Sequence, residues 1–141
     1  NKDYELCIYA FNVLKTLKKL PADQRLMSQV NYWIAYIGLH GSNSIKGEIE
    51  EWDVSAYDKA FHLAKDVLLE NYSQAIATLE PLYINGELST NEITTWPLFE
   101  LFRQSEEYVK FTQKYAADFG VQTMKINEES DIAECITPEN E

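Results

Sequence analysis

The feature of this sequence that most restricts its fold is the helical spacing of its apolar residues. Apolar side chains recur at steps of three and four residues in four successive segments, which places each set on one face of an α-helix. The four faces are Leu6, Tyr9, Ala10, Val13, Leu14, Leu17 and Leu20; Leu26, Met27, Val30, Ile34 and Ile37; Tyr57, Ala60, Phe61, Ala64, Val67 and Leu68; and Tyr72, Ala75, Ile76, Leu79 and Leu82. The pattern predicts an all-α fold in which these faces are buried against neighbouring helices.

Short breaks separate these segments, so consecutive helices are expected to pack antiparallel. Pro21 opens the second segment, Gly41 is placed to end it, and Glu70-Asn71 forms a tight turn between the third and the fourth. Ser105 follows as the N-cap of a final helix. The sequence predicts an antiparallel stack of helix hairpins with about six to seven helices.

The length of 141 residues suits one domain with a single core. We predict that residues 1–120 form this helical domain and that residues 121–141 form an acidic C-terminal tail. Because the chain opens without methionine, we interpret it as a piece of a larger protein. No apolar run approaches the roughly 18 residues that span a bilayer, so we expect no membrane insertion.

The chain is strongly acidic, with a formal net charge of −11. The charge is uneven: residues 1–20 are mildly basic, whereas residues 121–141 carry six acidic side chains against Lys125 alone. An acidic surface repels phosphate backbones, so we expect no direct binding of nucleic acid by this chain.

The two cysteines give no sign of a redox or metal motif. Cys7 and Cys135 lie near opposite ends of the chain, without the spacing of a CxxC motif. We interpret them as free thiols in preference to a disulfide that joins the termini. The cysteines therefore do not indicate whether the protein works in a reducing or an oxidising compartment.

Residues that often perform chemistry are scattered along the chain. His40 precedes a loop that contains glycine, His62 lies in the third helical segment, and neither has a metal-ligand partner at close spacing. The acidic cluster from Glu48 to Asp53 is interpreted as a solvated helix face, with a cation or a basic peptide as the alternative. We expect no cofactor, no metal ion and no enzymatic activity.

Aromatic side chains give the clearest indication of a binding surface. Tyr32, Trp33 and Tyr36 cannot all point to one side of a helix, because adjacent residues diverge by about 100°. In one interpretation they only pack in the core. In the other, they and Phe61 line a groove that receives a peptide of a partner. Tyr32, Trp33, Tyr36 and Phe61 are therefore the candidate partner-binding residues.

The segment from Phe61 to Tyr83 resembles a tetratricopeptide repeat. That repeat has a large and then a small apolar residue in its first helix, an aromatic residue after the turn, and a small residue three positions later. The matching residues, which the resemblance assigns to repeat packing, are Ala64, Tyr72, Ala75 and Leu79. The two alanines are small enough for two helix axes to approach closely. The resemblance implies a superhelix of paired α-helices.

The segment PLFELFRQSEEYVKF resembles an ending found after such repeats in regulatory regions of bacterial winged-helix activators and nucleotide cyclases. Pro97, Phe99, Arg103 and Tyr108 take the positions of P-x-F-x-x-x-R-(about four)-F, with Tyr in place of the last Phe. Trp96 precedes them and is assigned to the same terminal cap. The apolar side chains expected to cover the last repeat are Leu98, Phe99, Leu101 and Phe102. Arg103 is expected to reach the acidic start of the final helix.

Together the pattern and the resemblance imply a regulatory module of a larger bacterial protein. It would bind a peptide, a partner domain or a second copy of itself, in the cytoplasm or, within a membrane-linked regulator, in the periplasm. The alternative is a ligand-sensing domain or an enzyme with a pocket between helices, in which His40, His62, Arg103 or acidic groups converge. The interaction hypothesis predicts instead an exposed apolar patch larger than a few hundred Å². A structural spacer would show neither feature.

Overall fold

The computed structural model describes residues 3–17 and 19–120. These residues form an all-α fold, as predicted: they contain eight α-helices and three short 3₁₀-helices, and no β-strand lies among them. The predicted acidic tail and Cys135 lie outside the described residues.

The helices follow one another with short connections. Their bounds are α1 (Tyr4–Leu14), α2 (Ala22–His40), η1 (Ser42–Ser44), α3 (Lys46–Glu51), α4 (Lys59–Leu68), α5 (Tyr72–Ile84), α6 (Thr90–Thr95), η2 (Pro97–Phe99), η3 (Phe102–Gln104), α7 (Glu106–Lys114) and α8 (Ala116–Phe119), where η marks a 3₁₀-helix.

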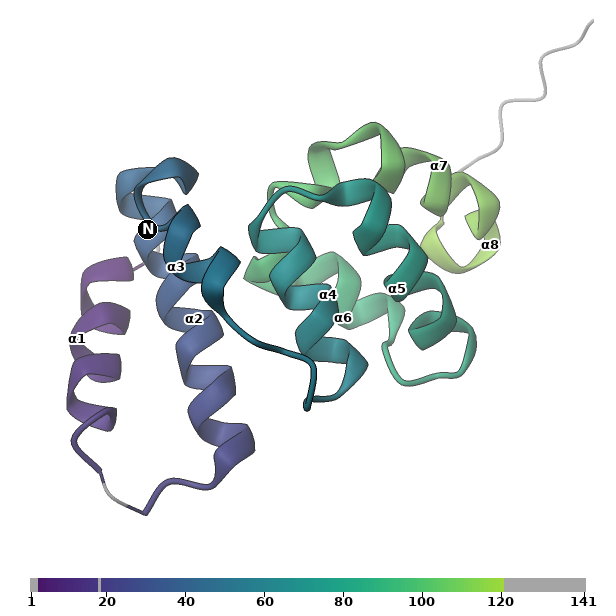
Figure 1. Ribbon diagram of the computed structural model, residues 1–141. Helices are drawn as coiled ribbons and strands as arrows, with labels where there is room; N and C mark the ends of the chain where they lie inside the picture. The colour runs from purple at the N-terminus through teal and green to yellow at the C-terminus, as the bar shows by residue number, and fades with distance from the viewer. Residues whose placement is uncertain (1–2, 18, 121–141) are drawn as a thin grey trace, which may run out of the picture.

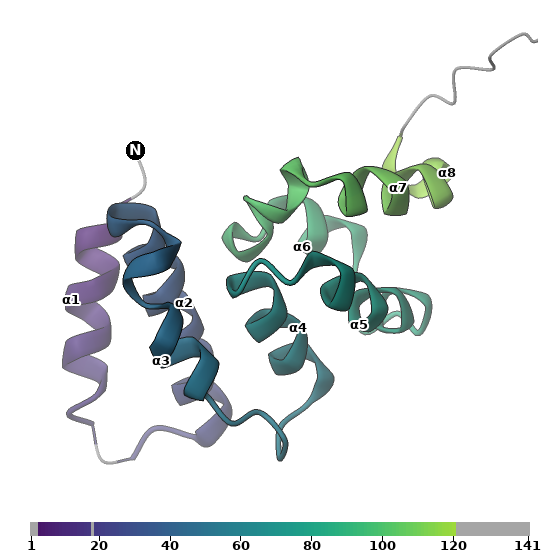
Figure 2. The same cartoon turned by 45° about the horizontal axis from the view of Figure 1, so that its top comes forward.

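Two antiparallel hairpins organise the molecule (Figure 1). Helices α1 and α2 form the first hairpin at one end, and α4 and α5 form the second. Helix α3 lies beside α2 and also contacts α4, while α7 and α8 lie at the far end of the molecule (Figure 2). The chain therefore advances from the α1–α2 end to the α7–α8 end, one hairpin after another.

The α4–α5 hairpin packs as the apolar pattern predicts. Ala64 of α4 and Ala75 of α5 are almost completely buried, and Leu63 and Leu79 are buried with them. Small side chains at this crossing allow the two helix axes to approach closely, and the leucines fill the space beside them. Tyr72, at the start of α5, is half-buried against the ring of Phe102 with 5.4 Å between the ring centroids.

The segment that was expected to close the stack is buried in the core. Phe99 and Phe102 are fully buried, and Leu98 is buried beside them. Trp96 and Tyr108 pack edge-on against these phenylalanines, at centroid distances of 5.6 and 5.5 Å. Leu101, which was expected to join them, is half-exposed instead.

The prediction for Arg103 was wrong. Its Nη1 atom donates hydrogen bonds to the carbonyl oxygens of Ile93 and Trp96, at 3.2 and 3.0 Å, and does not reach the acidic start of α7. The last carbonyl groups of a helix have no partner within the helix and carry partial negative charge. Arg103 therefore fastens the end of α6 from η3.

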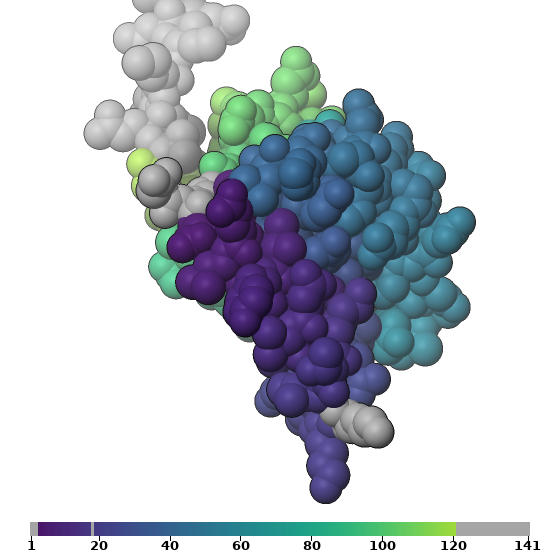
Figure 3. Space-filling view, turned by 90° about the vertical axis from the view of Figure 1, so that its left-hand side faces the viewer, coloured from purple at the N-terminus to yellow at the C-terminus, as the bar shows by residue number. Residues whose placement is uncertain are grey.

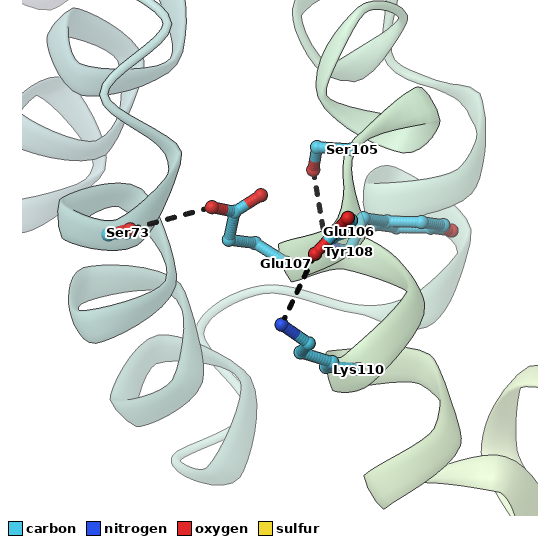
Figure 4. Close-up of polar contacts among 6 residues, drawn as sticks. All are labelled: Ser73, Ser105, Glu106, Glu107, Tyr108 and Lys110. Atoms are coloured by element: carbon cyan, nitrogen blue, oxygen red, sulfur yellow. Dashed lines mark hydrogen bonds and ion pairs between the residues drawn. The ribbon is translucent and has the colours of Figure 1, made fainter.

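Helix α7 begins as predicted (Figure 4). The Ser105 hydroxyl accepts a hydrogen bond from the Tyr108 N–H at 3.2 Å, which makes Ser105 the N-cap. Ser73 of α5 donates to Glu107 at 3.5 Å, and Lys110 lies 3.5 Å from Glu106 on the same helix. The cap and the Lys110–Glu106 pair stabilise the first turn of α7, and the Ser73–Glu107 hydrogen bond joins this turn to α5.

Helix α1 differs from the prediction in its length and its orientation. It ends at Leu14 and not near Leu20, because the Thr16 hydroxyl bonds the Val13 carbonyl at 2.7 Å and competes with the main chain. Most of the predicted apolar face points to solvent, and only Leu14 and Leu20 of this face are partly buried. The exposed fractions of its side chains are 59% for Leu6, 67% for Tyr9, 46% for Val13 and 49% for Leu17.

Helix α1 is apolar on two sides, which is why the spacing alone selected the wrong face. The buried side centres on Phe11, whose ring stacks on Tyr32 of α2 with 4.6 Å between centroids. Cys7 lies on this side as a free thiol, with its Sγ 3.6 Å from the Asn31 carbonyl oxygen. The packing of α1 on α2 therefore uses the second apolar side.

The ends of α4 and α5 share one backbone motif. In α4 the Glu70 N–H bonds the Val67 carbonyl and the Asn71 N–H bonds the Asp66 carbonyl, with Glu70 at a φ of 60°. In α5 the Gly86 and Glu87 N–H groups bond Tyr83 and Leu82 in the same way, with Gly86 at a φ of 73°. Both are Schellman motifs, which place their capping residue in the left-handed region. The expected turn at Glu70-Asn71 is therefore present.

Candidate functional site

An open groove bordered by described residues lies at the α1–α2 end of the molecule. Its volume is about 680 Å³, and we call it the hairpin groove. The side chains that line it are Phe11, Leu14, Lys15, Leu17, Leu20, Arg25, Leu26, Ser28, Gln29, Trp33, Glu48, Glu51 and Trp52. They come from both helices of the first hairpin, from the connection between these helices, and from α3 and its C-cap Trp52. The groove exists because α3 lies beside α2 (Figure 2).

Apolar and aromatic side chains form the inner surface of the hairpin groove. Trp33 is almost fully buried, and its ring packs edge-on against Trp52 with 4.9 Å between centroids. Trp52 in turn contacts Phe61 of α4 at 6.3 Å. This row of rings joins the groove to the second hairpin, so one side of the groove is built on the core of the protein.

Polar contacts hold Trp33 and Trp52 in these positions. The indole Nε1 of Trp33 donates to Glu48 Oε1 at 3.1 Å, which links α2 to α3. The Lys65 ammonium of α4 donates to the carbonyl oxygens of Glu50 and Trp52, at 2.8 and 2.6 Å. A cation at the end of a helix stabilises its unpaired carbonyl groups. Lys65 therefore fixes α3 and the groove wall that it forms.

The two lips of the hairpin groove carry opposite charge. Lys15 and Arg25 stand on the side of the α1–α2 turn, and Glu48 and Glu51 stand on α3. Lys15 lies over the Phe11 ring at 5.1 Å, and Arg25 donates to the Leu20 carbonyl at 3.1 Å. Among the described residues, neither cation forms an ion pair. Both charges are thus available to a bound molecule.

One polar group in the groove lacks a partner. The Nε2 atom of Gln29 is buried and makes no hydrogen bond to any described residue. A buried donor without an acceptor costs about 1–3 kcal/mol, and such groups are rare in native proteins. An acceptor oxygen placed within hydrogen-bond distance would satisfy it.

The structure divides the four candidate partner-binding residues into two groups. Trp33 lines the hairpin groove, and Phe61 supports it through Trp52. Tyr32 instead stacks on Phe11, and the Tyr36 ring lies 5.7 Å from the Tyr32 ring. Burial, with smaller contributions from Glu48 and Tyr36, raises the pKa of the Tyr32 phenol above its ordinary value. The four residues therefore do not form one surface.

Sequence reasoning missed several residues of the groove. Gln29, Arg25 and Lys15 carry no motif, and only the turn of the chain after α1 brings them together. Leu14, Leu20 and Leu26 were assigned to buried helix faces. The one available signal was that α1 has apolar residues on two sides. A single neighbouring helix cannot cover both sides, so part of this apolar surface is left for another contact.

A second cavity of about 460 Å³ lies between the other end of the first hairpin and the second hairpin. Tyr4 and Gly38 border it on one side, and Val67, Leu68 and Pro97 border it on the other. Its lining is mainly apolar, and it separates the outer hairpin from the segment that closes the stack.

The polar residues that the alternative of a ligand or enzyme pocket would bring together have separate surroundings. The His40 ring packs on Tyr36 at 4.5 Å, and Arg103 binds the carbonyl groups at the end of α6. His62 lies on α4 near Asp66, whose carboxyl pKa is raised mainly by burial and lowered to a lesser extent by His62. Within residues 3–17 and 19–120, no group of three His, Cys, Asp or Glu side chains is placed to hold a metal ion. None of the described helices combines the length and the apolarity that a membrane crossing requires.

Comparisons with known proteins returned no match: no family model, no curated protein and no solved structure matches this chain. The resemblance of residues 61–83 to a tetratricopeptide repeat, and the roles of Ala64, Tyr72, Ala75 and Leu79 in it, stay predictions. The same holds for the terminal-cap motif, although its phenylalanines are buried.

Proposed function

We propose that this chain is a protein-interaction module that binds an amphipathic α-helix of a partner protein in the hairpin groove. The observation that supports it most is the composition of the groove: an apolar and aromatic inner surface between two lips of opposite charge. Recognition of a helix in a groove requires an apolar floor for the apolar face of the helix and polar edges for its flanks. Tryptophan is also among the residues that dominate binding energy at protein interfaces.

The charges on the lips define the chemistry of the partner. An α-helix whose apolar face points into the groove presents one flank to Lys15 and Arg25 and the other to Glu48 and Glu51. We infer that the partner helix carries acidic residues on the first flank and basic residues on the second. Complementary charges of this kind add specificity and speed to association more than they add affinity.

We extend the proposal to the parent protein. In line with the resemblance to repeat regions of bacterial regulators, the binding of a partner here would regulate the protein to which this module belongs. The arrangement of helices suits that role, because Lys65 and Phe61 connect the groove wall to the second hairpin.

A second candidate function is the sensing of a small apolar ligand in the same groove. Its volume of about 680 Å³ supports this candidate, because small-molecule sites have volumes of about 300–1,000 Å³. The two candidates differ in their dependence on the lips. A small apolar molecule needs the floor alone, whereas a charged helix also needs Lys15, Arg25, Glu48 and Glu51.

The test uses three synthetic helical peptides with one identical apolar face. The first carries glutamate on one flank and lysine on the other, the second carries glutamate on both, and the third carries lysine on both. Binding is measured by tryptophan fluorescence and by calorimetry. We expect the mixed peptide to bind about tenfold more tightly than either of the others, since one unfavourable flank costs about 1.4 kcal/mol.

A charge-reversed protein supplies the decisive control. In the double variant Lys15→Glu and Arg25→Glu both lips are acidic, so the lysine-flanked peptide is expected to become the tightest ligand. Lys110→Glu, which reverses a single charge on α7 far from the groove, should leave the original order of affinities in place. If the order of the peptides does not change in the double variant, the groove does not select a helix by charge. Equal binding of all three peptides would favour the small-ligand candidate.

A further inference from the structure

The cavity of about 460 Å³ between the two hairpins is distinct from the hairpin groove, and we call it the inter-hairpin cavity. It lies where α2 meets η2, and Figure 3 shows the blue end of α2 next to the green part of the chain beyond α6. Among the described residues, none borders both cavities. A ligand can therefore occupy one cavity and leave the other empty.

The walls of the inter-hairpin cavity are apolar. The residues that form them include Ile34 and Ile37 of α2, Val67 of α4 and Leu98 of η2, and the last two are buried. Leu101, which is half-exposed, borders the same cavity. Small-molecule sites have mainly apolar walls and volumes of about 300–1,000 Å³, so this cavity has the size and the lining of such a site.

The charges at the border of this cavity are negative. Glu70 follows the end of α4 and Glu100 follows η2, and no Lys, Arg or His is among the described residues that border the cavity. The carboxyl ends of α2 and α4 also lie there, at Gly41 and Glu70, and each helix end adds a partial negative charge. Lys46 borders a separate, smaller space next to Glu70, and its ammonium group lies 3.9 Å from Glu50.

Glu70 has a backbone conformation that residues other than glycine rarely adopt. Its φ is 60°, and the equivalent position in the motif that ends α5 is Gly86. The Glu70 side chain is exposed, so packing in the core does not account for a glutamate here. Backbone strain of this kind is concentrated at functional sites, where the side chain has a role that offsets its cost. The strain therefore singles out Glu70 among the residues that border the cavity.

We propose that the inter-hairpin cavity binds a small organic cation, with the apolar part of the molecule between the hairpins and its ammonium group next to the Glu70 carboxylate. Charge complementarity identifies this ligand, because carboxylates and helix carboxyl ends around an apolar cavity attract a cation and repel an anion. The Tyr4 ring also borders the cavity, and aromatic rings attract cations. This site is independent of the helix binding proposed for the hairpin groove.

Three probes with one apolar body test the charge preference on the whole chain. Phenylbutylamine is a cation at neutral pH, phenylbutanol is neutral, and phenylbutanoate is an anion. Their affinities are measured by nuclear magnetic resonance titration and by calorimetry. We expect the amine to bind about tenfold more tightly than the alcohol, and the carboxylate to bind most weakly. The amine should also raise the melting temperature, because it binds the folded chain.

Two variants of Glu70 connect this preference to the site. Glu70→Gln keeps the length of the side chain and removes its charge, so the affinity for the amine should fall about tenfold, to that of the alcohol. Glu70→Gly removes the carboxylate and the backbone strain together. It should lose the same preference while it withstands more urea than the natural chain. A glutamate with a purely structural role would not combine weaker binding with a more stable fold.

Two further variants locate the bound probe. Leu101→Trp places a larger side chain at the inter-hairpin cavity and should weaken the binding of all three probes. Glu51→Gln removes one negative charge from the hairpin groove and should leave the three affinities unchanged. Saturating amine should also leave the binding of the helical peptides unchanged, so this site and the hairpin groove are tested separately. Circular dichroism establishes that each variant is folded.

Several outcomes count against the proposal. Equal affinity for the three probes, or an amine that does not bind up to its limit of solubility, would falsify it. An amine preference that survives in Glu70→Gln and Glu70→Gly would also overturn it. A preference lost in Glu51→Gln would place the cation in the hairpin groove and not between the hairpins.

Discussion

The ring of Tyr4 lies directly on the backbone of α2 at Gly38. A Cβ atom at this position would lie 2.5 Å from Cε2 and 2.6 Å from Cζ of Tyr4, which is closer than real carbon atoms approach. Glycine in the middle of a helix costs stability. Here it makes room for the first residue of α1 to dock on α2.

Tyr4 and Gly38 are therefore expected to be energetically coupled. Alanine is favoured over glycine inside a helix by about 1 kcal/mol, and this gain is free of a clash only when the tyrosine ring is absent. We expect Gly38→Ala to stabilise the Tyr4→Ala background by up to about 1 kcal/mol and to be less favourable in the natural chain by the cost of the clash with the Tyr4 ring. Urea unfolding of the four chains gives the coupling energy. Equal effects of Gly38→Ala in both backgrounds would show that the ring moves aside at no cost.

The two Schellman motifs predict opposite effects of glycine at their capping positions. Glu70 has a positive φ that is unfavourable for any residue with a Cβ atom, so Glu70→Gly should raise the free energy of unfolding by about 0.5–1 kcal/mol. Gly86→Ala creates the same backbone strain at the end of α5, so this variant should lower the free energy of unfolding by about 1 kcal/mol. Glu70→Ala removes the charge and keeps the backbone strain. Comparing it with Glu70→Gly therefore separates the effect of the glutamate side chain from the effect of the strain. A destabilising Glu70→Gly would mean that the glutamate side chain contributes more than its backbone costs.

The crossing of α4 and α5 predicts a large effect at one alanine and a small effect at another. Ala75 is fully buried, so Ala75→Leu should lower the free energy of unfolding by about 1–3 kcal/mol through overpacking. Ala77 lies two residues further on the same helix and is exposed, so Ala77→Leu should change it by less than about 0.5 kcal/mol. Chemical denaturation measures both. Similar values for the two variants would be evidence against the close approach of α4 and α5 at Ala75.

Glu80 predicts a pH-dependent contribution to stability. Hydrogen bonds from Lys114 and then Tyr115 lower the pKa of the Glu80 carboxyl below its ordinary value, and they join α5 to α7 and the residue that follows it. A carboxyl with a lowered pKa in the folded state stabilises the protein above its ordinary pKa, and this contribution is lost as the pH falls through the lowered value. Glu80→Gln should therefore cost up to about 1 kcal/mol at neutral pH and nothing in strong acid.

The measurement for Glu80 is the free energy of unfolding of both chains from neutral to acidic pH. Glu51→Gln serves as the control, because Glu51 forms no ion pair within residues 3–17 and 19–120. The two curves for the natural chain and Glu80→Gln should converge as the pH falls. A constant difference at all pH values would show that Glu80 contributes through packing and not through its charge.

The parts of the fold that follow from local spacing were predictable from the sequence. The helical faces that contain Ala64 and Ala75, the N-cap at Ser105 and the burial of Phe99 and Phe102 all depend on residues close together in the chain. Periodicity and capping chemistry describe such relationships directly. The candidate aromatic residues were chosen in the same way, and Trp33 and Phe61 both belong to the groove or its support.

The parts that depend on distant segments were not predictable. Helix α1 has two apolar sides, and only the shape of α2 decides which one is buried. Arg103 was paired with charges nearby in sequence, whereas it binds carbonyl groups that the turn after α6 places beside it. The hairpin groove exists because α3 lies next to α2, an arrangement fixed by the contacts of Trp33 with Glu48 and of Lys65 with the end of α3. Periodicity and capping patterns in a single sequence contain no information about how distant segments are placed relative to one another.

Among the described residues, those before residue 41 hold three basic and three acidic side chains, whereas residues 41–120 hold six and fourteen, so the molecule has an electric dipole moment. An acidic protein that approaches in solution turns this dipole before any contact is made, so that the α1–α2 end leads and the acidic end trails. Collisions with such a protein are therefore oriented toward the α1–α2 end, and salt weakens this orientation because it screens the field of the dipole.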